Sequence, residues 1–502
     1  MLTILQFDAA SARLLDRLLG DGRLPTLAAL RERGTWLDLD APATQFAAGA
    51  QHTLYSGTPL EDHGLFYPFQ WSAAEQRARY MGDLHAPTPV WEQLAPTGRR
   101  TLAIDPYESR APSIDPPGTL VCGWQLHDRV VLRKWDRPAG THRRLQSAFG
   151  KPSPVDEVFG RHSVPEMLGL RRRLLGAPGR VADATLLLMG EGEYDLAWCT
   201  FCAAHVAGHQ FWDLSQLDAD RLDPSSEGLL ASALEDTYIA VDAAIGRIVD
   251  ALPPGSDLMV ISPVGMDVNT SRADLLPEML RCILEPGYRA EDAPSGSIWK
   301  LRAALPSGLR AKVAGALPEK VALDLTARLE LRGIDWSRTR AFAHPAENQG
   351  YVRLNLKGRE RDGIVDPAAA PALLDELADG IRSFTSLDGT PAVKDVQRVA
   401  DRFGSGSYSH QLPDLIVHWV DTPATTLEGL RSERYGTVRR HGVGSGRSGN
   451  HTEGDAWALL VPGSSQVAKL DRPPKLEDVA ATALALAGGD PSTTAGQPLL
   501  IR

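Results

Sequence analysis

Residues 194–212, with the sequence YDLAWCTFCAAHVAGHQFW, decide the fold. The first part, Tyr194–Cys202, is a short and almost continuously apolar run, typical of a strand buried on both faces of a parallel sheet. The second part places His205 and His209 four residues apart, on one face of a helix. Because open α/β sheets bind ligands at the carboxyl ends of their strands, this stretch predicts both a fold and a site.

Strands and helices alternate on both sides of this stretch. Leu2–Phe7 predicts a buried strand, and Ser11–Leu19 predicts a helix with one leucine-rich face. Asp257–Ser262 and Ala456–Val461 predict two further core strands. The pattern predicts an α/β fold with a mostly parallel central sheet and helices on both faces.

The chain divides by pattern into a core in three parts and two further segments. The core parts are 1–110, 176–270 and 431–502, the segment 111–175 is an insertion, and 271–430 is a second, smaller, cap-like α+β lobe. We assign 111–175 as an insertion because it is rich in Arg and Pro and does not show the alternation of strands and helices. Within the second lobe we expect a helix over 309–321.

Composition excludes several classes of protein. The chain has 502 residues with 43% hydrophobic and 23% charged residues, as in soluble globular proteins, and its net charge of −10 disfavours nucleic acid as a partner. Its four cysteines are too few for a disulfide framework. No run approaches the ~20 apolar residues of a membrane span, and the first residues lack the basic region of a signal peptide. We therefore expect a cytoplasmic protein with a small-molecule substrate and no membrane partner; the sequence does not indicate its oligomeric state.

A third histidine, His451 in the sequence SGNHTEGDAW, also lies next to a predicted core strand. The pair His205 and His209 together with a remote histidine predicts a three-nitrogen metal shell with one open position, which suits a catalytic site. Pairs of histidines four residues apart also arise by chance. A hydrogen-bonded packing cluster is therefore the alternative.

Seven segments of the chain, in order, resemble the alkaline phosphatase superfamily, specifically its type I phosphodiesterase / nucleotide pyrophosphatase branch. They are FDAASARLLDRLLGDGRLPTLAALRERG, TLYSGTPLEDHGLF, YDLAWCTFCAAHVAGHQFW, YVRLNLKGRERDGIV, LPDLIV, NHTEGDAWALLVPG and LEDVAATALALAG with GQPLL. The resemblance implies two divalent ions about 4 Å apart and a Thr or Ser nucleophile. One ion is held by an Asp-x-x-x-His pair and a distant His, and the other by the first-strand Asp, an Asp-His dipeptide and the nucleophile.

The family's first metal site carries over with one change. Asp8 matches the first-strand Asp, His209 matches the His of the pair and His451 matches the distant His. His205 stands where the pair has its Asp. The resemblance thus implies a metal site whose three ligand positions are all histidine.

The family's second metal site does not carry over. Ala47 occupies the nucleophile position, and Pro263 and Val264 replace the Asp-His dipeptide, so that only Asp8 remains of this ligand set. We therefore expect one divalent metal ion. Zn²⁺ is the preferred assignment, and Fe, Cu and Ni are the alternatives that three histidines also bind.

These residues predict a divergent metal-dependent hydrolase that uses activated water, or a related lyase or transfer reaction, with Asp8 as base or orienter. The alternative is a non-catalytic pseudoenzyme that binds a ligand or partner through the old pocket. His52 and Arg447 are candidate neighbours of the metal ligands, while a flexible surface loop is the alternative for Arg447. His63 is expected to be structural, and a second site rebuilt from His52, His63 or Asp267 stays open.

Overall fold

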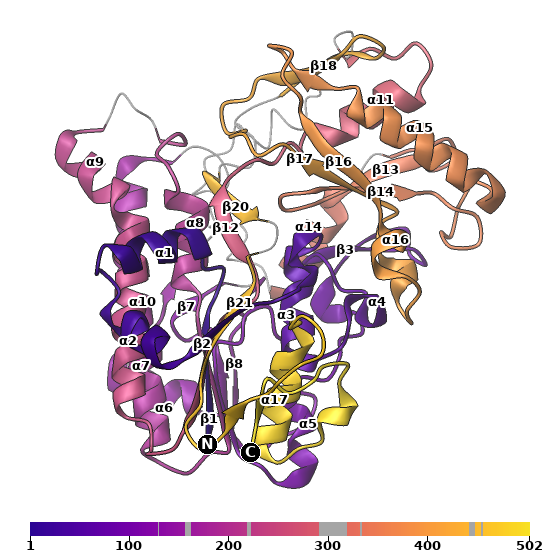
Figure 1. Ribbon diagram of the computed structural model, residues 1–502. Coiled ribbons are helices and arrows are strands. Elements are labelled where there is room, and N and C mark those ends of the chain that lie inside the picture. Colours follow the sequence, from indigo (N-terminus) through magenta and orange to yellow (C-terminus); the bar gives the residue numbers. More distant parts are fainter. Residues whose placement is uncertain are drawn as a thin grey trace.

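The computed structural model describes residues 1–128, 130–155, 162–217, 222–290, 319–331, 334–440, 447–452 and 455–502. An eight-stranded sheet lies at its centre, with the order β2-β21-β11-β1-β10-β5-β6-β8 (Figure 1). The strands are β1 Leu2–Phe7, β2 Thr35–Asp38, β5 Thr101–Ile104, β6 Gly118–Cys122, β8 Trp135–Arg137, β10 Leu196–Phe201, β11 Asp257–Ser262 and β21 Trp457–Val461. The five strands from β11 to β6 are parallel, and β2, β21 and β8 run antiparallel to their neighbours. The predicted mostly parallel sheet is confirmed.

Helices cover both faces of this sheet, which explains why its strands read as continuous apolar runs. Every residue of β1, β10 and β11 is buried. Figure 1 shows one group of helices on the side of α7 and α10 and another on the side of α3 and α17. The first group contains α1 Ala12–Gly20, α2 Pro25–Arg33, α7 Val164–Met189, α8 Ala203–Phe211 and α10 Ala233–Asp250; the second contains α3 Ala47–Ser56, α5 Val90–Gln93 and α17 Glu477–Ala487.

The second lobe is built on an antiparallel sheet with its own apolar core. This sheet contains β13 Ala341–His344, β14 Gly350–Leu354, β17 Leu415–Trp419 and β16 Val393–Arg398, in that order, with helices α11 Leu276–Leu284 and α15 Ala370–Arg382 beside it. A separate apolar cluster joins the lobes, with Phe46 and Phe66 from the core packed against Tyr351 and Ile416 from the lobe. The lobe is therefore seated directly above α3 and its following loop.

Two short elements connect the lobes beside the main sheet. Strand β12, Gly265–Val268, follows β11, and strand β20, Gly449–Thr452, precedes β21. They pair antiparallel, with Met266 opposite His451. The remaining elements named below are α4 Leu60–His63, β4 Arg77–Tyr80 and α6 Thr141–Phe149.

The segment 111–175 differs from the prediction of an insertion. Strands β6 and β8 belong to the central sheet, and α7 begins within the segment at Val164. The Pro- and Arg-rich stretches that hid the alternation are the loops between these short elements. The helix expected over 309–321 lies almost entirely outside the described residues, and α14 covers Glu319–Glu330. Among the described residues, none of the helices combines the length and apolarity that crossing a membrane requires.

Candidate metal centre

The carboxyl ends of three neighbouring parallel strands deliver the candidate site residues. Asp8 directly follows β1, and His205 and His209 lie on α8, which begins two residues after β10. His451 lies on β20, whose partner β12 follows β11. Because β10, β1 and β11 are adjacent and parallel, these segments meet at one edge of the sheet.

The structure brings the three predicted histidines together. Their ring centroids are separated by 4.9 Å between His205 and His209, 4.7 Å between His205 and His451, and 4.9 Å between His209 and His451. One ligand nitrogen from each lies within 4.8 Å of those of the other two, and all three side chains are buried. The spacing is that of a cluster able to share one ion with small side-chain adjustments.

Hydrogen bonds fix the orientation of two of these rings. His205 Nδ1 lies 2.7 Å from Asp8 Oδ2, and His209 Nδ1 lies 3.0 Å from the carbonyl oxygen of Gly449. Since carboxylate and carbonyl oxygens accept, both Nδ1 atoms donate, which directs the two Nε2 atoms into the cluster. They lie 3.1 Å apart. Metal-binding histidines commonly donate their second ring nitrogen to such an oxygen.

Burial and nearby positive charges lower the pKa values of two of the three histidines. Burial lowers the pKa of His209 well below its usual value, and the charge of Arg447 adds to this effect. Burial also lowers the pKa of His451, followed by the effects of His205 and Arg447. His209 and His451 are therefore neutral at pH 7, the state in which imidazole binds a metal.

Asp8 is fully buried and uses both carboxylate oxygens as acceptors. Oδ1 accepts from Gln6 Nε2 at 3.1 Å and from Gln51 Nε2 at 2.7 Å, while Oδ2 accepts from His205. The next residue, Ala9, has a φ of 51°, a conformation that is uncommon for a residue other than glycine. Of the two roles expected for Asp8, the contact with His205 favours that of orienter.

Apolar side chains fill the positions where the second ligand set would stand. Ala47 is the buried first residue of α3. Pro263 and Val264 are buried directly after β11. None of the three offers a side-chain donor atom to a cation, and the amide of Gln51, one turn after Ala47, contacts Asp8 instead.

The other predicted residues divide between the site and its surroundings. Arg447 lies near enough to act on His209 and His451, and its carbonyl oxygen accepts from Asn269. His63 is structural as predicted: Nε2 lies 3.0 Å from Thr53 Oγ1, and Nδ1 accepts from the backbone of Leu65.

His52 and Asp267 do not join the histidine cluster. The His52 ring is 5.9 Å from that of His63, and it lines a separate cavity. Asp267 forms an ion pair with Arg13. The open possibility of a second site rebuilt from His52, His63 or Asp267 therefore finds no support in their positions.

Sequence reasoning missed several residues at the site. Gln51 lies four residues after Ala47 on one helix face, and Gln6 lies two residues before Asp8 on one side of β1, so spacing alone could have found both. Glu347 gave no such signal. It lies in the loop between β13 and β14, and tertiary packing places its Oε2 3.3 Å from His451 Nε2.

Comparisons with known proteins agree with this architecture. The family model for type I phosphodiesterase / nucleotide pyrophosphatase matches residues 2–443. Phosphonoacetate hydrolase from Sinorhizobium meliloti in complex with phosphonoformate is similar in structure, with a TM-score of 0.51 at 14% identity, covering 97% of this chain and 95% of that one. Murine ectonucleotide pyrophosphatase / phosphodiesterase 5 gives a TM-score of 0.43 at 8% identity over the same shares. No curated protein sequence matches the chain.

Proposed function

The chain belongs to the type I phosphodiesterase / nucleotide pyrophosphatase family of the alkaline phosphatase superfamily, and from this membership we propose that it is a hydrolase with one metal ion held by His205, His209 and His451. Zn²⁺ is the preferred ion because a buried set of three imidazoles is a typical zinc shell. The proposed substrate is a small molecule, like the phosphonoformate bound by the phosphonoacetate hydrolase.

The observation that carries this proposal is the contact between His205 Nε2 and His209 Nε2 at 3.1 Å. Both rings donate through Nδ1, so in their neutral forms two lone pairs would face each other across this distance. Such a contact is favourable when a metal ion lies between the two atoms or when one ring carries a proton on Nε2, and the proposal takes the first of these states. Ligands of a tetrahedral zinc ion, bound at about 2.0–2.1 Å, are about 3.3 Å apart, close to the observed separation.

The residues around the cluster have defined tasks. Asp8 holds His205 with Nε2 directed inward, and the Gly449 carbonyl does the same for His209. A divalent ion bound here supplies Lewis acidity, which polarises a substrate oxygen and acidifies water. Since Ala47 has no nucleophilic atom, we propose that water attacks the substrate and that no covalent intermediate forms at this position.

Elemental analysis of the purified protein tests the metal site. We expect close to one ion per chain, its loss in His205→Ala, and its retention in the control His410→Ala, because His410 is exposed. Hydrolysis of a phosphodiester and of a carboxylic ester is assayed on the same preparations. A protein that neither contains nor takes up metal would refute the proposal and favour the non-catalytic pseudoenzyme.

A further inference from the structure

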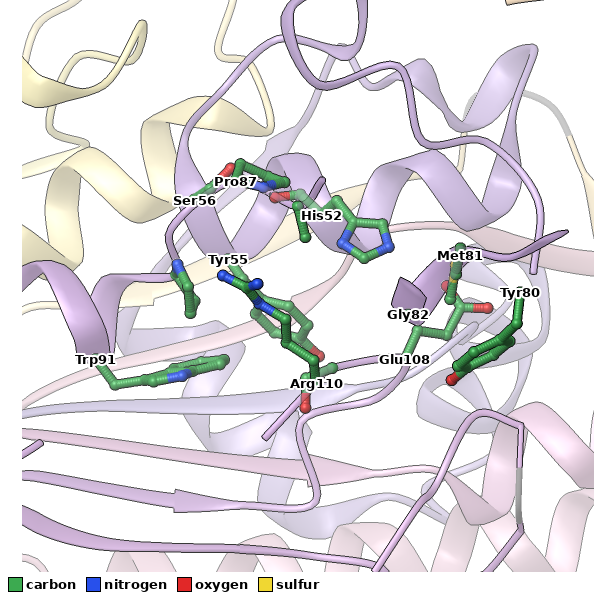
Figure 2. A pocket seen from close by; sticks show the side chains of 13 residues that line it. His52, Tyr55, Ser56, Tyr80, Met81, Gly82, Pro87, Trp91, Glu108 and Arg110 are labelled. Atoms are coloured by element: carbon green, nitrogen blue, oxygen red, sulfur yellow. Dashed lines mark hydrogen bonds between the residues drawn. The ribbon is translucent and has the colours of Figure 1, made fainter. Parts of the chain in front are cut away.

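A cavity separate from the histidine cluster lies at the loop that follows β5 (Figure 2). Its volume is about 30 Å³, and its walls include the aromatic side chains of Tyr55, Tyr80 and Trp91. The loop joins the two sites: the ring of Tyr107 lies 4.7 Å from that of His205, and the residues directly after it line the cavity. The loop after β5 therefore contacts the cluster through Tyr107 and the cavity through the residues that follow it.

Three buried side-chain nitrogen atoms at this cavity have no hydrogen-bond partner among the described residues, and Trp91 Nε1 is one of them. His52 Nε2 and Arg110 Nε are buried, and neither makes a hydrogen bond within the described part of the chain. Figure 2 shows the imidazole of His52 and the guanidinium of Arg110 at the cavity, while the carboxylate of Glu108 is directed away from Arg110 towards Met81. Burying a donor without a partner is unfavourable, so native structures seldom keep one without a ligand or water to accept from it.

The backbone that carries Arg110 is strained. Asp105 has a φ of 50° and Glu108 a φ of 57°, in the left-handed region that residues with a side chain seldom adopt. The Asp105 carboxylate holds the start of this loop by accepting from the backbone of Trp124 at 2.8 Å and Gln125 at 2.7 Å. Strain of this kind persists at sites where it positions a functional group.

We propose that this cavity binds the carboxylate of a small organic acid, with Arg110 and His52 as hydrogen-bond donors and the aromatic walls around the attached carbon chain. The planar guanidinium matches a carboxylate in geometry and charge. A water molecule needs roughly 10–15 Å³, so the cavity holds the three non-hydrogen atoms of one carboxylate, and the attached carbon chain extends from them towards the open side of the cavity. The idea that this acid is the substrate rests on the proposed function. The binding of the acid in this cavity is independent of it.

The protonation state of His52 agrees with this role. Burial, followed by the charge of Arg110, lowers the pKa of His52 to about 4. The imidazole is therefore neutral at pH 7 and offers one N–H donor. The guanidinium alone supplies the positive charge, which makes Arg110 the residue to change first.

Ligand-observed NMR titration measures the binding of propionate and benzoate, with propan-1-ol as the uncharged probe. We expect saturable binding of both acids and none of the alcohol. Arg110→Gln should weaken acid binding at least tenfold, and Arg110→Lys less than Arg110→Gln. The control Arg144→Gln should leave binding unchanged, because Arg144 on α6 pairs with Glu191. Equal affinity of acid and alcohol, tighter binding of inorganic phosphate, or unchanged affinity in a folded Arg110→Gln would each overturn the proposal.

The same titration on the double variant His205→Ala, His209→Ala separates this inference from the proposed function. If the native chain binds no metal yet both proteins bind propionate, the metal proposal fails and the carboxylate site stands. If the native chain binds metal and shows no saturable binding of either acid, the carboxylate site fails and the metal proposal stands.

Discussion

Asp8→Asn is the substitution whose consequence follows most directly from the hydrogen bonds of the site. Gln6 Oε1 accepts from Tyr55 at 3.1 Å and Trp198 at 3.1 Å, so that the Gln6 amide nitrogen must face Gln51 and Asp8. The Gln51 oxygen accepts from Gln6 at 2.9 Å, so its nitrogen also faces Asp8. Both glutamines and His205 thus donate to Asp8, and both of its oxygens must accept.

While His205 keeps its proton on Nδ1, the tautomer that leaves Nε2 free for a metal ion, an asparagine at position 8 can satisfy only one side of this arrangement. If its oxygen accepts from His205, its amide nitrogen faces two donors, and if it turns, its nitrogen faces His205 Nδ1. Hydrogen bonds to a charged group contribute about 1.5–3 kcal/mol, and a buried unsatisfied donor costs about 1–3 kcal/mol. We therefore expect Asp8→Asn to lower the free energy of unfolding by about 2.5–6 kcal/mol, the range given by these two terms together. Metal affinity should fall about 10–100-fold, as for other partners of metal-binding histidines.

Urea unfolding and competition with a chromophoric chelator measure these two quantities. The double variant Asp8→Asn, Gln51→Glu restores an acceptor opposite the asparagine nitrogen, so it should recover part of the stability but not the charge beside His205. Asp267→Asn is the control, because its partner Arg13 has an exposed side chain, so the ion pair should contribute less than about 1 kcal/mol. If Asp8→Asn unfolds and binds metal like the native protein, the assignment of Asp8 as the residue that orients His205 is wrong.

Three further predictions concern other parts of the molecule. Glu347→Gln removes the carboxylate 3.3 Å from His451 Nε2 and should weaken metal affinity about tenfold or more in the chelator assay, whereas equal affinity would show that the contact does not matter. Glu360→Gln leaves the guanidinium of Arg353 in the second lobe without its buried carboxylate partner at 2.8 Å and should cost about 3–5 kcal/mol in urea unfolding; a change below about 1 kcal/mol would contradict this. Because the pKa of His52 is about 4 in the folded chain and 6.5 without burial, its contribution to stability is present above pH 6.5 and is lost as the pH falls towards 4. Between these pH values the free energy of unfolding in urea should therefore depend less on pH in His52→Gln than in the native protein. An equal pH dependence in the two proteins would show that His52 does not cause it.

The parts of the fold that sequence predicts best are those whose burial is complete. The sequence predicts Leu2–Phe7 and Asp257–Ser262 to the residue, since strands buried on both faces are mostly apolar. Strand β8 was missed because it has three residues, lies at the sheet edge and is only partly buried. Its sequence carries no apolar run to mark it.

A similar division holds at the site. The spacing of His205 and His209 places them on one turn of α8, so the pair was visible in the sequence. The partner of His209 is a backbone carbonyl, at Gly449, and no residue type could indicate it. Glu347 reaches His451 only because the second lobe packs on the core, a long-range arrangement that local patterns do not encode.

The surroundings of Asp8 bear on whether the second metal site was lost by decay. A buried carboxylate that loses its cation without compensation is strongly unfavourable, because several kcal/mol of desolvation is no longer offset. Asp8 is not in that situation, since the amides of Gln6 and Gln51 donate to the oxygen that does not contact His205. Those amides are in turn fixed by Tyr55 and Trp198, so the acceptor role of Asp8 is imposed from outside the site. The hydrogen bonds from Gln6, Gln51 and His205 thus satisfy both carboxylate oxygens of Asp8 without a second cation, which agrees with the proposal of a single ion.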